Sequence, residues 1–305
     1  MNKIRDIIII GAGPAGLTAA IYAKRAQLDT LLIERFGAGG QIINTYEVDN
    51  YPALPGINGY DLGEKMSQHA DKFEVERVNA EVISMALSDK IKVVTTDNGE
   101  YKAYCVILAS GNSPSKLTIP GEEELTGCGV SYCATCDGAF FRNRTVTVIG
   151  GGDVAVEDAI FLARGCKKVY LVHRRDELRA AKILSQSLME LDNVEIIWDS
   201  IPERINGEEQ VESISLKNVK TGEERLIETD GVFVAIGNTP NGQYIDGLEL
   251  DARGYVKAGE DCITSIEGVY AAGDIRSKKL RQVVTAVADG ANAVYSAESY
   301  LLRIR

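Results

Sequence analysis

Two cysteines and an aspartate form the group of residues with the clearest chemical potential. They lie together as Cys133-Ala-Thr-Cys136-Asp137, the only close cysteine pair in a chain with six cysteines. A CxxC pair closes readily into a disulfide, and its thiolates exchange with other disulfides. When two electrons reach such a disulfide, one sulfur leaves as a thiolate, which a carboxylic acid with a raised pKa can protonate. The pattern predicts a reversible disulfide with Asp137 as its proton donor, although a helix cap or a solvated carboxylate also fits Asp137.

Other uses of cysteine fit the sequence less well. A zinc site needs about four thiolate or imidazole ligands. Cys128 could supply a third thiolate, but His69 and His173 stand in unrelated contexts and there is no second CxxC or CxxH pair. We therefore expect no metal. Thiols that only pack in a core are a further alternative, and it suits the three cysteines that stand singly in apolar or mixed surroundings, Cys105, Cys166 and Cys262.

The N-terminal segment predicts a site for a dinucleotide. Ile7–Ile10 is typical of a buried parallel strand, Gly11-Ala-Gly13-Pro-Ala-Gly16 follows it, and a helical stretch covers Leu17–Arg25. The three glycines allow a tight turn, close approach of the backbone to a pyrophosphate, and close helix packing. The exposed N–H groups and the helix dipole favour the anion. After the strand Leu31–Ile33, Glu34 stands 18 residues beyond Gly16, where a carboxylate can bind a ribose diol.

The same pattern returns later in the chain and predicts a second dinucleotide site. Val146–Ile149 leads into Gly150-Gly-Gly152-Asp-Val-Ala155, and a helix is expected from Val156 to Arg164. The sequence therefore contains two copies of a strand, a glycine turn and a helix.

Cations replace the ribose-binding carboxylate in the second copy. The residue 18 positions past Ala155 is His173, followed by Arg174 and Arg175, with Arg179 one turn further on. Guanidinium groups can clamp a 2′-phosphate, which a carboxylate would repel. The second copy is therefore predicted to prefer NADPH to NADH, with a solvated basic face as the alternative.

The duplication extends to a β-hairpin and a following apolar strand in each copy. The predicted hairpin turns are 97–99 and 220–222, and the strands that follow end at Gly111 and Gly237. The loops 112–115 and 238–243 come next and suit links between domains. We expect an α/β fold of two Rossmann-like, three-layer ββα domains, with residues 114–241 inserted between the two parts of the first domain, 1–113 and 242–305.

Size and charge limit the classes of function. A chain of 305 residues exceeds what one core usually serves. The net charge of -11 and the pI of 4.9 argue against sequence-independent binding to nucleic acid or anionic membrane. The longest early apolar run, Ile7–Ile10, is too short for a signal peptide or a membrane helix, so a cytoplasmic protein is expected.

Over essentially the whole chain, the sequence resembles the low-molecular-weight, bacterial-type thioredoxin reductases, a class II pyridine nucleotide-disulfide oxidoreductase family. Besides the glycine motifs and Cys133–Asp137, the likeness rests on Gly39-Gly-Gln41, Glu47-Val-Asp-Asn50, Ile119-Pro-Gly-Glu122, His173-Arg-Arg-Asp176 with Arg179-Ala180, and Gly268-Val-Tyr-Ala-Ala-Gly-Asp274. The resemblance implies FAD and NADPH as cofactors, thioredoxin as the protein substrate, and a homodimer. It also implies that 1–113 and 242–305 bind FAD and that 114–241 binds NADPH and carries the CxxC pair.

Individual site residues also follow from the resemblance. Asp274 would bind the FAD ribitol, Gln41 and Asn50 would lie near the flavin, and Arg281-Gln282 would follow along it. The full set implied for FAD is Gly11, Gly13, Pro14, Ala15, Gly16, Glu34, Arg35, Gly40, Gln41, Asn50, Val82, Ala109, Gly111, Gly273, Asp274, Arg281, Gln282 and Val283. The set implied for NADPH is Gly150, Gly152, Asp153, Val154, His173, Arg174, Arg175, Arg179, Ile236 and Gly237.

The implied reaction passes a hydride from NADPH to FAD, reduces the disulfide with help from Asp137, and ends in exchange with thioredoxin. By the same resemblance, Cys136 would face the flavin and Cys133 would meet the protein substrate. We hypothesise that the inserted domain rotates about its two links, since both the nicotinamide and the disulfide must reach the flavin. The alternatives are a related flavoprotein that reduces a small-molecule disulfide and a redox-sensing flavin-binding protein. A ferredoxin–NADP reductase without thiol chemistry is disfavoured by the cysteine pair.

Overall fold

The computed structural model describes residues 3–45, 48–242 and 245–305, which divide into two compact units. Unit 1 consists of Met1–Ser113 and Thr239–Arg305, and unit 2 of Pro114–Asn238. Asn241, predicted to lie in the inserted domain, is grouped with unit 1, where its side chain bonds to the Ser110 carbonyl and the Ser113 hydroxyl, each at 3.0 Å. The predicted motif residue Glu47 and link residue Gln243 lie outside the described residues.

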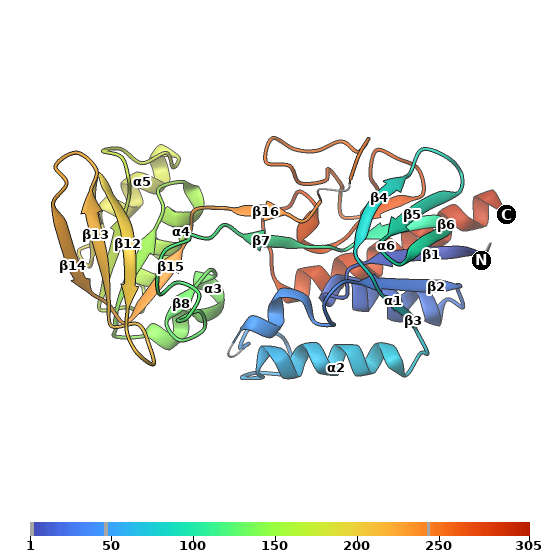
Figure 1. Cartoon of the computed structure of the whole chain (residues 1–305), viewed down its shortest axis with the longest axis horizontal. Helices are drawn as coiled ribbons and strands as arrows, with labels where there is room; N and C mark the ends of the chain where they lie inside the picture. Colours follow the sequence, from blue (N-terminus) through green and yellow to red (C-terminus); the bar gives the residue numbers. More distant parts are fainter. Residues whose placement is uncertain (1–2, 46–47, 243–244) are drawn as a thin grey trace. The chain divides into compact units, whose positions relative to one another are not determined.

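Unit 1 is built on a seven-stranded sheet in the order β3-β2-β1-β6-β5-β4, with β17 also paired to β6 (Figure 1). The strands are β1 (Ile4–Ile10), β2 (Thr30–Glu34), β3 (Glu76–Asn79), β4 (Val82–Ala86), β5 (Lys92–Thr96), β6 (Gly99–Leu108) and β17 (Val269–Ala271). The helices are α1 (Pro14–Arg25), α2 (Gly59–Asp71) and α6 (Val283–Ile304), with the short 3-10 helices η1 (Gly40–Asn44) and η3 (Gly273–Ile275). Strands β1, β2, β3, β6 and β17 pair in parallel, whereas β4 and β5 form antiparallel pairs.

Strand β1 is buried on both faces, as predicted for the first isoleucine run. Ile7 and Ile9 pack in a core with α1 and α6, whereas Ile8 and Ile10 pack on the other face with parts of 245–275. The two helices meet closely at Gly290 of α6, where an added Cβ would overlap the carbonyl of Ala15. These contacts fix the start of α1 against the carboxyl end of β1.

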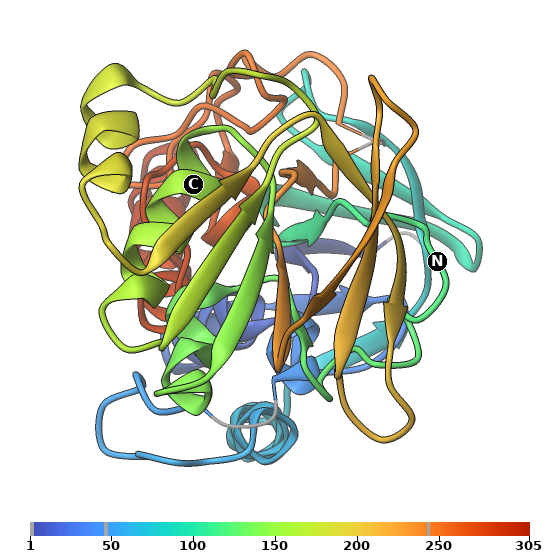
Figure 2. The same ribbon diagram turned by 90° about the vertical axis from the view of Figure 1, so that its left-hand side faces the viewer.

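Unit 2 contains a five-stranded parallel sheet in the order β11-β10-β9-β15-β8 and a three-stranded antiparallel sheet, β12-β13-β14. The strands are β8 (Val130–Ser131), β9 (Thr145–Ile149), β10 (Lys168–Val172), β11 (Val194–Ile197), β12 (Ser200–Asn206), β13 (Ser213–Asn218), β14 (Glu224–Glu228) and β15 (Gly231–Val234). The helices are α3 (Ala134–Asp137), α4 (Asp153–Ala163) and α5 (Lys182–Met189), with the 3-10 helix η2 (Gly138–Phe141). Figure 2 looks onto this unit and shows three layers, with α4 and α5 on one face of the parallel sheet and the smaller sheet on the other.

The connecting segments form two short strands, β7 (Asn112–Pro114) and β16 (Asn238–Pro240), which pair with each other. The predicted strands 7–10, 31–33, 146–149 and 169–172 are confirmed within β1, β2, β9 and β10, and both predicted hairpins are present. The second predicted helix begins earlier than expected, at Asp153. Among the described residues, no helix combines the length and apolar character needed to cross a membrane.

Candidate active site

The first glycine motif joins β1 to α1 through a tight turn. Gly11 has φ +103°, a conformation that favours glycine, and an added Cβ at Gly16 would overlap the carbonyl of Gly11. Gly13 is the N-cap of α1 and no side chain caps the helix, so its first N–H groups are available to an anion. Gly40 lies against this loop, because its added Cβ would come within 2.9 Å of Gly13 Cα. The turn thus has the shape that a pyrophosphate needs.

Glu34 lies at the end of β2 beside the same turn. Its carboxylate accepts hydrogen bonds from the backbone N–H groups of Ala12, at 2.7 Å, and Phe36, at 2.9 Å. A cavity of about 160 Å³ opens next to it, lined by Ala12, Leu32, Glu34, Phe36, Gly37, Ala38, Arg77, Val78 and Asn79. Each carboxylate oxygen keeps a lone pair for a hydroxyl of a ribose.

The loop that carries Gly273 and Asp274 contains and contacts several buried charged groups. Oδ1 of Asp274 is buried and forms an ion pair with Lys278 at 3.8 Å, but it has no hydrogen-bond partner among the described residues. Burial raises the pKa of this carboxyl. Arg281 has buried Nε and Nη2 atoms that also lack a hydrogen-bond partner within the described parts of the chain, and its guanidinium lies 4.1 Å from the centre of the Tyr255 ring. Buried polar groups are rarely left unpaired in native proteins, so these atoms mark where a polar ligand would bind.

Asp289 of α6 holds this loop in place. Its carboxylate accepts from Gly273 N at 2.9 Å, from both Arg276 Nε and Nη2, and from Lys278 Nζ at 2.9 Å. Burial alone would raise the pKa of Asp289, but the hydrogen bonds from Arg276 and Lys278 outweigh it and lower the pKa. Gly273 in turn approaches α1, since its added Cβ would come within 2.9 Å of Ala15 Cβ.

The other predicted FAD residues also belong to unit 1. Asn50 donates to the Gln282 side chain at 2.9 Å, and Gln282 and Val283 begin α6. The carbonyl of Ala109 lies against Gly11, Gly111 has φ +68°, and Val82 is buried at the start of β4. Arg35 is held by an ion pair with Glu81 at 2.6 Å and lies over the Phe36 ring. Gln41 is exposed on η1.

The residues of unit 1 therefore fit FAD. An uncapped helix start behind a glycine cradle suits the pyrophosphate, and Glu34 beside a cavity suits the ribose. The atoms of Asp274 and Arg281 that lack hydrogen bonds among the described residues supply one acceptor and several donors for further polar groups.

The second glycine motif repeats this geometry in unit 2. Gly150 follows β9 directly and lies against Ala155, since its added Cβ would come within 2.6 Å of Ala155 Cβ. Gly152 is the N-cap of α4, with no side-chain cap and open space where a Cβ would stand. The carboxylate of Asp153 accepts from Ala181 N at 2.8 Å, which ties the start of α4 to the segment before α5. Val154, Ile236 and Gly237 border the same end of the sheet, and all three are exposed.

The loop after β10 presents three arginines to solvent. Arg174, Arg175 and Arg179 are exposed, and none of them forms an ion pair within the described parts of the chain. The neighbouring carboxylate of Asp176 is instead paired with Lys220 at 2.7 Å. Three uncompensated guanidinium groups beside an open helix start suit a phosphate.

His173 takes a different place from these arginines. It is 4% exposed, its ring lies where a side chain on Gly151 would stand, and Trp198 packs edge-on at 6.4 Å. Burial and the nearby Arg179 lower the pKa of His173. The imidazole therefore supports the loop as a neutral group, and the positive charge comes from the arginines.

The cysteine pair forms a disulfide at the start of α3. Cys133 is the N-cap of this short helix, and the two Cα atoms are 5.3 Å apart. Both residues are partly exposed, and the Thr135 hydroxyl lies 3.5 Å from Cys133 Sγ. The remaining free cysteines differ, since Cys105, Cys166 and Cys262 are buried and Cys128 is exposed. The cysteines predicted to form a redox pair are thus partly exposed, whereas the three predicted to pack in a core are buried.

Asp137 ends α3 and is held by Ser131 of β8. The Ser131 hydroxyl lies 2.6 Å from Asp137 Oδ2 and accepts from the N–H of Cys133 at 3.1 Å. Burial raises the pKa of Asp137, and the hydrogen bond from Ser131 partly opposes it. The carboxyl therefore keeps its proton to higher pH than an ordinary aspartate, as a proton donor requires.

A family model for the pyridine nucleotide-disulphide oxidoreductases matches residues 5–290 of this chain. The chain belongs to the pyridine nucleotide-disulphide oxidoreductase family. The family name agrees with two features described above, a loop whose exposed arginines suit a phosphate and a disulfide in the same unit.

Relatives within the pyridine nucleotide-disulphide oxidoreductase family match nearly the whole chain. A thioredoxin reductase of Peptoclostridium litorale is 48% identical, over 99% of this chain and 98% of its own length. A thioredoxin reductase of Bacillus subtilis is 46% identical, over 98% of this chain and 96% of its own length. The crystal structure of a thioredoxin reductase from Streptococcus pyogenes superposes with a TM-score of 0.95 at 44% identity, and covers 99% of this chain and 100% of its own.

Two site residues were missed by sequence reasoning, Ser131 and Asp289. A serine two residues before the CxxC pair and an aspartate within the last helix are common features, and neither carries a motif of its own. Their partners become evident only when β8 and α3, or α6 and the Gly273 loop, are placed together.

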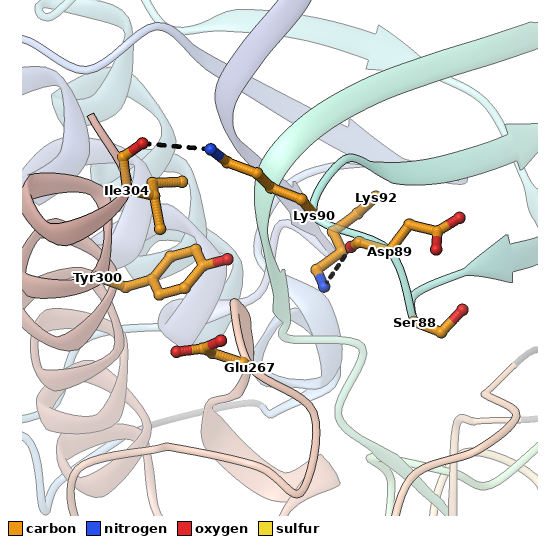
Figure 3. Close-up of a pocket in the computed structure, with 7 residues that line it drawn as sticks. All are labelled: Ser88, Asp89, Lys90, Lys92, Glu267, Tyr300 and Ile304. Carbon is orange, nitrogen blue, oxygen red and sulfur yellow. Dashed lines mark hydrogen bonds between the residues drawn. The ribbon is translucent and has the colours of Figure 1, made fainter.

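A second hollow of unit 1, of about 300 Å³, lies between the β4–β5 turn and the end of α6 (Figure 3). Lys92 is 2% exposed there and donates to the carbonyls of Leu87 and Asp89, both at 2.7 Å. Lys90 donates to the Ile304 carbonyl at 3.2 Å. These bonds fix the turn and the end of the helix, and no predicted site residue lines the hollow.

Proposed function

We propose that this chain is an NADPH-dependent thioredoxin reductase in which electrons pass from NADPH through FAD to the Cys133–Cys136 disulfide and then to oxidised thioredoxin. The observation that carries the proposal is the disulfide with its neighbour Asp137, whose pKa is raised by burial, in the same unit as the arginine loop. Relatives named thioredoxin reductase, at 48% and 46% identity, support the same reaction.

We assign FAD to unit 1 and NADPH to unit 2. In unit 1, the start of α1 would hold the pyrophosphate, Glu34 a ribose, and Asp274 with Arg281 further polar groups of the cofactor. In unit 2, the start of α4 would hold the NADPH pyrophosphate, and Arg174, Arg175 and Arg179 its 2′-phosphate. FAD, when bound, accepts a hydride and supplies two electrons to the disulfide.

Residues of this chain then carry out the proton transfer and the thiol–disulfide exchange. Two electrons break the S–S bond, and Asp137 gives its proton to one sulfur, which leaves one thiol, one thiolate and an ionised carboxylate. The partly exposed position of the pair lets the thiolate attack a disulfide of thioredoxin, which forms a mixed disulfide that the second sulfur resolves. The carboxylate recovers its proton from water.

We further propose a homodimer in the cytoplasm. A reducing compartment suits the free thiols of Cys105, Cys128, Cys166 and Cys262. Tyr295 and Leu302 of α6 are 74% and 77% exposed and stand seven residues apart on one helix face, which suits contact with a second copy.

Reduction of thioredoxin by NADPH under anaerobic conditions tests the function. Titration of the purified yellow protein with NADPH should find two two-electron centres, and the wild type and Cys128→Ser should both reduce thioredoxin. Cys133→Ser should keep flavin reduction by NADPH and lose thioredoxin reduction. Thioredoxin turnover by Cys133→Ser would contradict the proposal, and faster reduction of a small disulfide than of thioredoxin would favour the small-molecule alternative.

A further inference from the structure

The Ser131 hydroxyl lies between the redox disulfide and the proton donor. It is 2.6 Å from Asp137 Oδ2, and it accepts the N–H of Cys133 at 3.1 Å. Ser131 is 5% exposed, and its backbone is fixed by parallel pairing of β8 with β15, where it stands opposite Phe233. The sheet therefore sets the position of the hydroxyl, independently of the short helix that carries the disulfide.

The two carboxyl oxygens of Asp137 have different surroundings. Oδ2 has the Ser131 hydroxyl, whereas Oδ1 is buried and has no hydrogen-bond partner among the described residues. A buried anionic oxygen without a donor is costly, because no group replaces the water that it has lost. The proton is therefore most stable on Oδ1, while Oδ2 accepts from Ser131.

We propose that Ser131 is a positioning residue for disulfide reduction, which holds Asp137 through Oδ2 and leaves Oδ1 to carry the proton that goes to sulfur. This inference rests on the proposed function. Two electrons from NADPH break the bond between the sulfurs, the proton moves from Oδ1 to one of them, and the carboxylate keeps the Ser131 hydrogen bond until water reprotonates it. One group thus fixes the acid in both of its protonation states.

A purely local role is the competing explanation. Serine at the end of a strand often bonds to the backbone two residues on, and the Ser131 hydroxyl is also 3.4 Å from the Cys133 carbonyl. Such a turn accounts for the contacts to Cys133, but it does not require a carboxylate at 2.6 Å. The two explanations differ in whether the loss of the hydroxyl changes the titration of Asp137.

Alkylation of the reduced cysteines distinguishes the two explanations, and the experiment needs neither NADPH nor thioredoxin. The protein is reduced with dithiothreitol, and the rate of reaction with iodoacetamide is measured across pH for the wild type, Ser131→Ala, Ser131→Thr and Asp137→Asn. Ionisation of Asp137 should give the wild type an inflection that Asp137→Asn lacks. Ser131→Ala should move this inflection to higher pH, because the donor that favours the carboxylate is gone, whereas Ser131→Thr should keep it in place.

Turnover provides the second measurement. Ser131→Ala should lower kcat about tenfold, move the alkaline limb of the pH profile to higher pH, and leave the KM for thioredoxin unchanged. The same substitution in an Asp137→Asn background should have no further effect on kcat. Ser200→Ala is the matched control, because Ser200 is also buried in unit 2 and its hydroxyl donates to the backbone carbonyl of Trp198 at 2.8 Å.

Several results would overturn the positioning role. They are an unshifted inflection in Ser131→Ala, a loss of kcat that Ser131→Thr does not restore, or an equal loss in the Asp137→Asn background. Ser131→Gly provides a second variant without the hydroxyl if Ser131→Ala does not fold. A wild type that fails to reduce thioredoxin would refute the proposed function alone, since the alkylation profiles would still decide the role of Ser131.

Discussion

The six cysteines occupy different surroundings, and these decide which sulfurs react. Burial raises the pKa of Cys105 and Cys262 to about 12, and that of Cys166 to about 11. Because the thiolate is the nucleophile, these three are inert at neutral pH. The partly exposed pair at the start of α3 therefore reacts without competition from the buried thiols.

Asp137 gives the first prediction. Because its pKa is raised, its acid form is present at low pH and is lost as pH rises through that value, so turnover should fall on the alkaline side. Asp137→Asn cannot donate the proton, and kcat for thioredoxin should fall by about 10²-fold or more at all pH values. Steady-state assays across pH check this, and a variant that keeps both the wild-type rate and its alkaline limb would contradict the acid role.

The same residue predicts a gain in stability. Between its unfolded and its folded pKa, Asp137 binds more protons in the folded state, so the stability of the wild type falls as pH rises through this window. Asp137→Asn removes the ionisation, so its melting temperature should exceed that of the wild type above the folded pKa and match it at low pH. A uniform shift at all pH values would show that another property of the side chain is responsible.

At the scale of elements, the loop from β10 to α5 combines a buried imidazole, which packs against Gly151, with exposed guanidinium groups. His173 fills the space beside Gly151, Asp153 holds the end of the loop, and the three guanidinium groups form no ion pair with any residue that the structure describes. We therefore expect the loop to bind a phosphate with little rearrangement, because its arginine side chains do not first have to break ion pairs with other described residues.

This loop predicts the choice of nicotinamide cofactor. Arg174→Ala, Arg175→Ala and Arg179→Ala should each lower kcat/KM for NADPH about tenfold, because each removes a charge-assisted contact to the 2′-phosphate. The value for NADH, which lacks that phosphate, should change little. Arg164→Ala, at the far end of α4 in the same unit, is the control and should leave both values unchanged. Equal losses for the two cofactors would exclude the 2′-phosphate role.

Helix α6 predicts a difference between buried and exposed ion pairs. Asp289→Ala leaves Arg276 and Lys278 buried without their carboxylate and should cost about 3–5 kcal/mol. Glu267→Ala removes the exposed pair with Arg303 from the same helix and should cost less than about 1 kcal/mol. Urea unfolding followed by circular dichroism measures both losses, and the single tryptophan, Trp198, reports separately on unit 2. If the unfolding free energy reported by Trp198 fell as much as that reported by circular dichroism, the effect of Asp289→Ala would not be centred on unit 1.

At the scale of the whole molecule, the exposed side chains of Tyr295 and Leu302 on α6 predict self-association. Tyr295→Glu should convert the dimer to a monomer, because it places a charge on the face that we assign to the second copy. Light scattering after gel filtration measures this, with Leu226→Glu in unit 2, a residue 63% exposed, as the control. A monomeric wild type, or a dimer that withstands Tyr295→Glu, would contradict the assignment.

The two-fold repetition of the nucleotide-binding architecture could be predicted from sequence because its signals are local. Gly11–Gly16 and Gly150–Ala155 each follow a buried strand directly, and the cysteine pair is separated by two residues. The contacts of Asp289 could not be predicted, since they depend on how α6 crosses the Gly273 loop. His173 stood within a run of cations, and only the packing of Gly151 shows that it is buried.

Unit 1 is made from two separated stretches of chain, whereas unit 2 is one continuous stretch, and this order affects synthesis on the ribosome. Residues 114–238 can complete their own core as soon as they have emerged. The first stretch must wait, because α1 packs against α6 and β6 pairs with β17, both of which are translated after unit 2. The nascent chain can therefore complete unit 2, which carries the disulfide, before unit 1 can close.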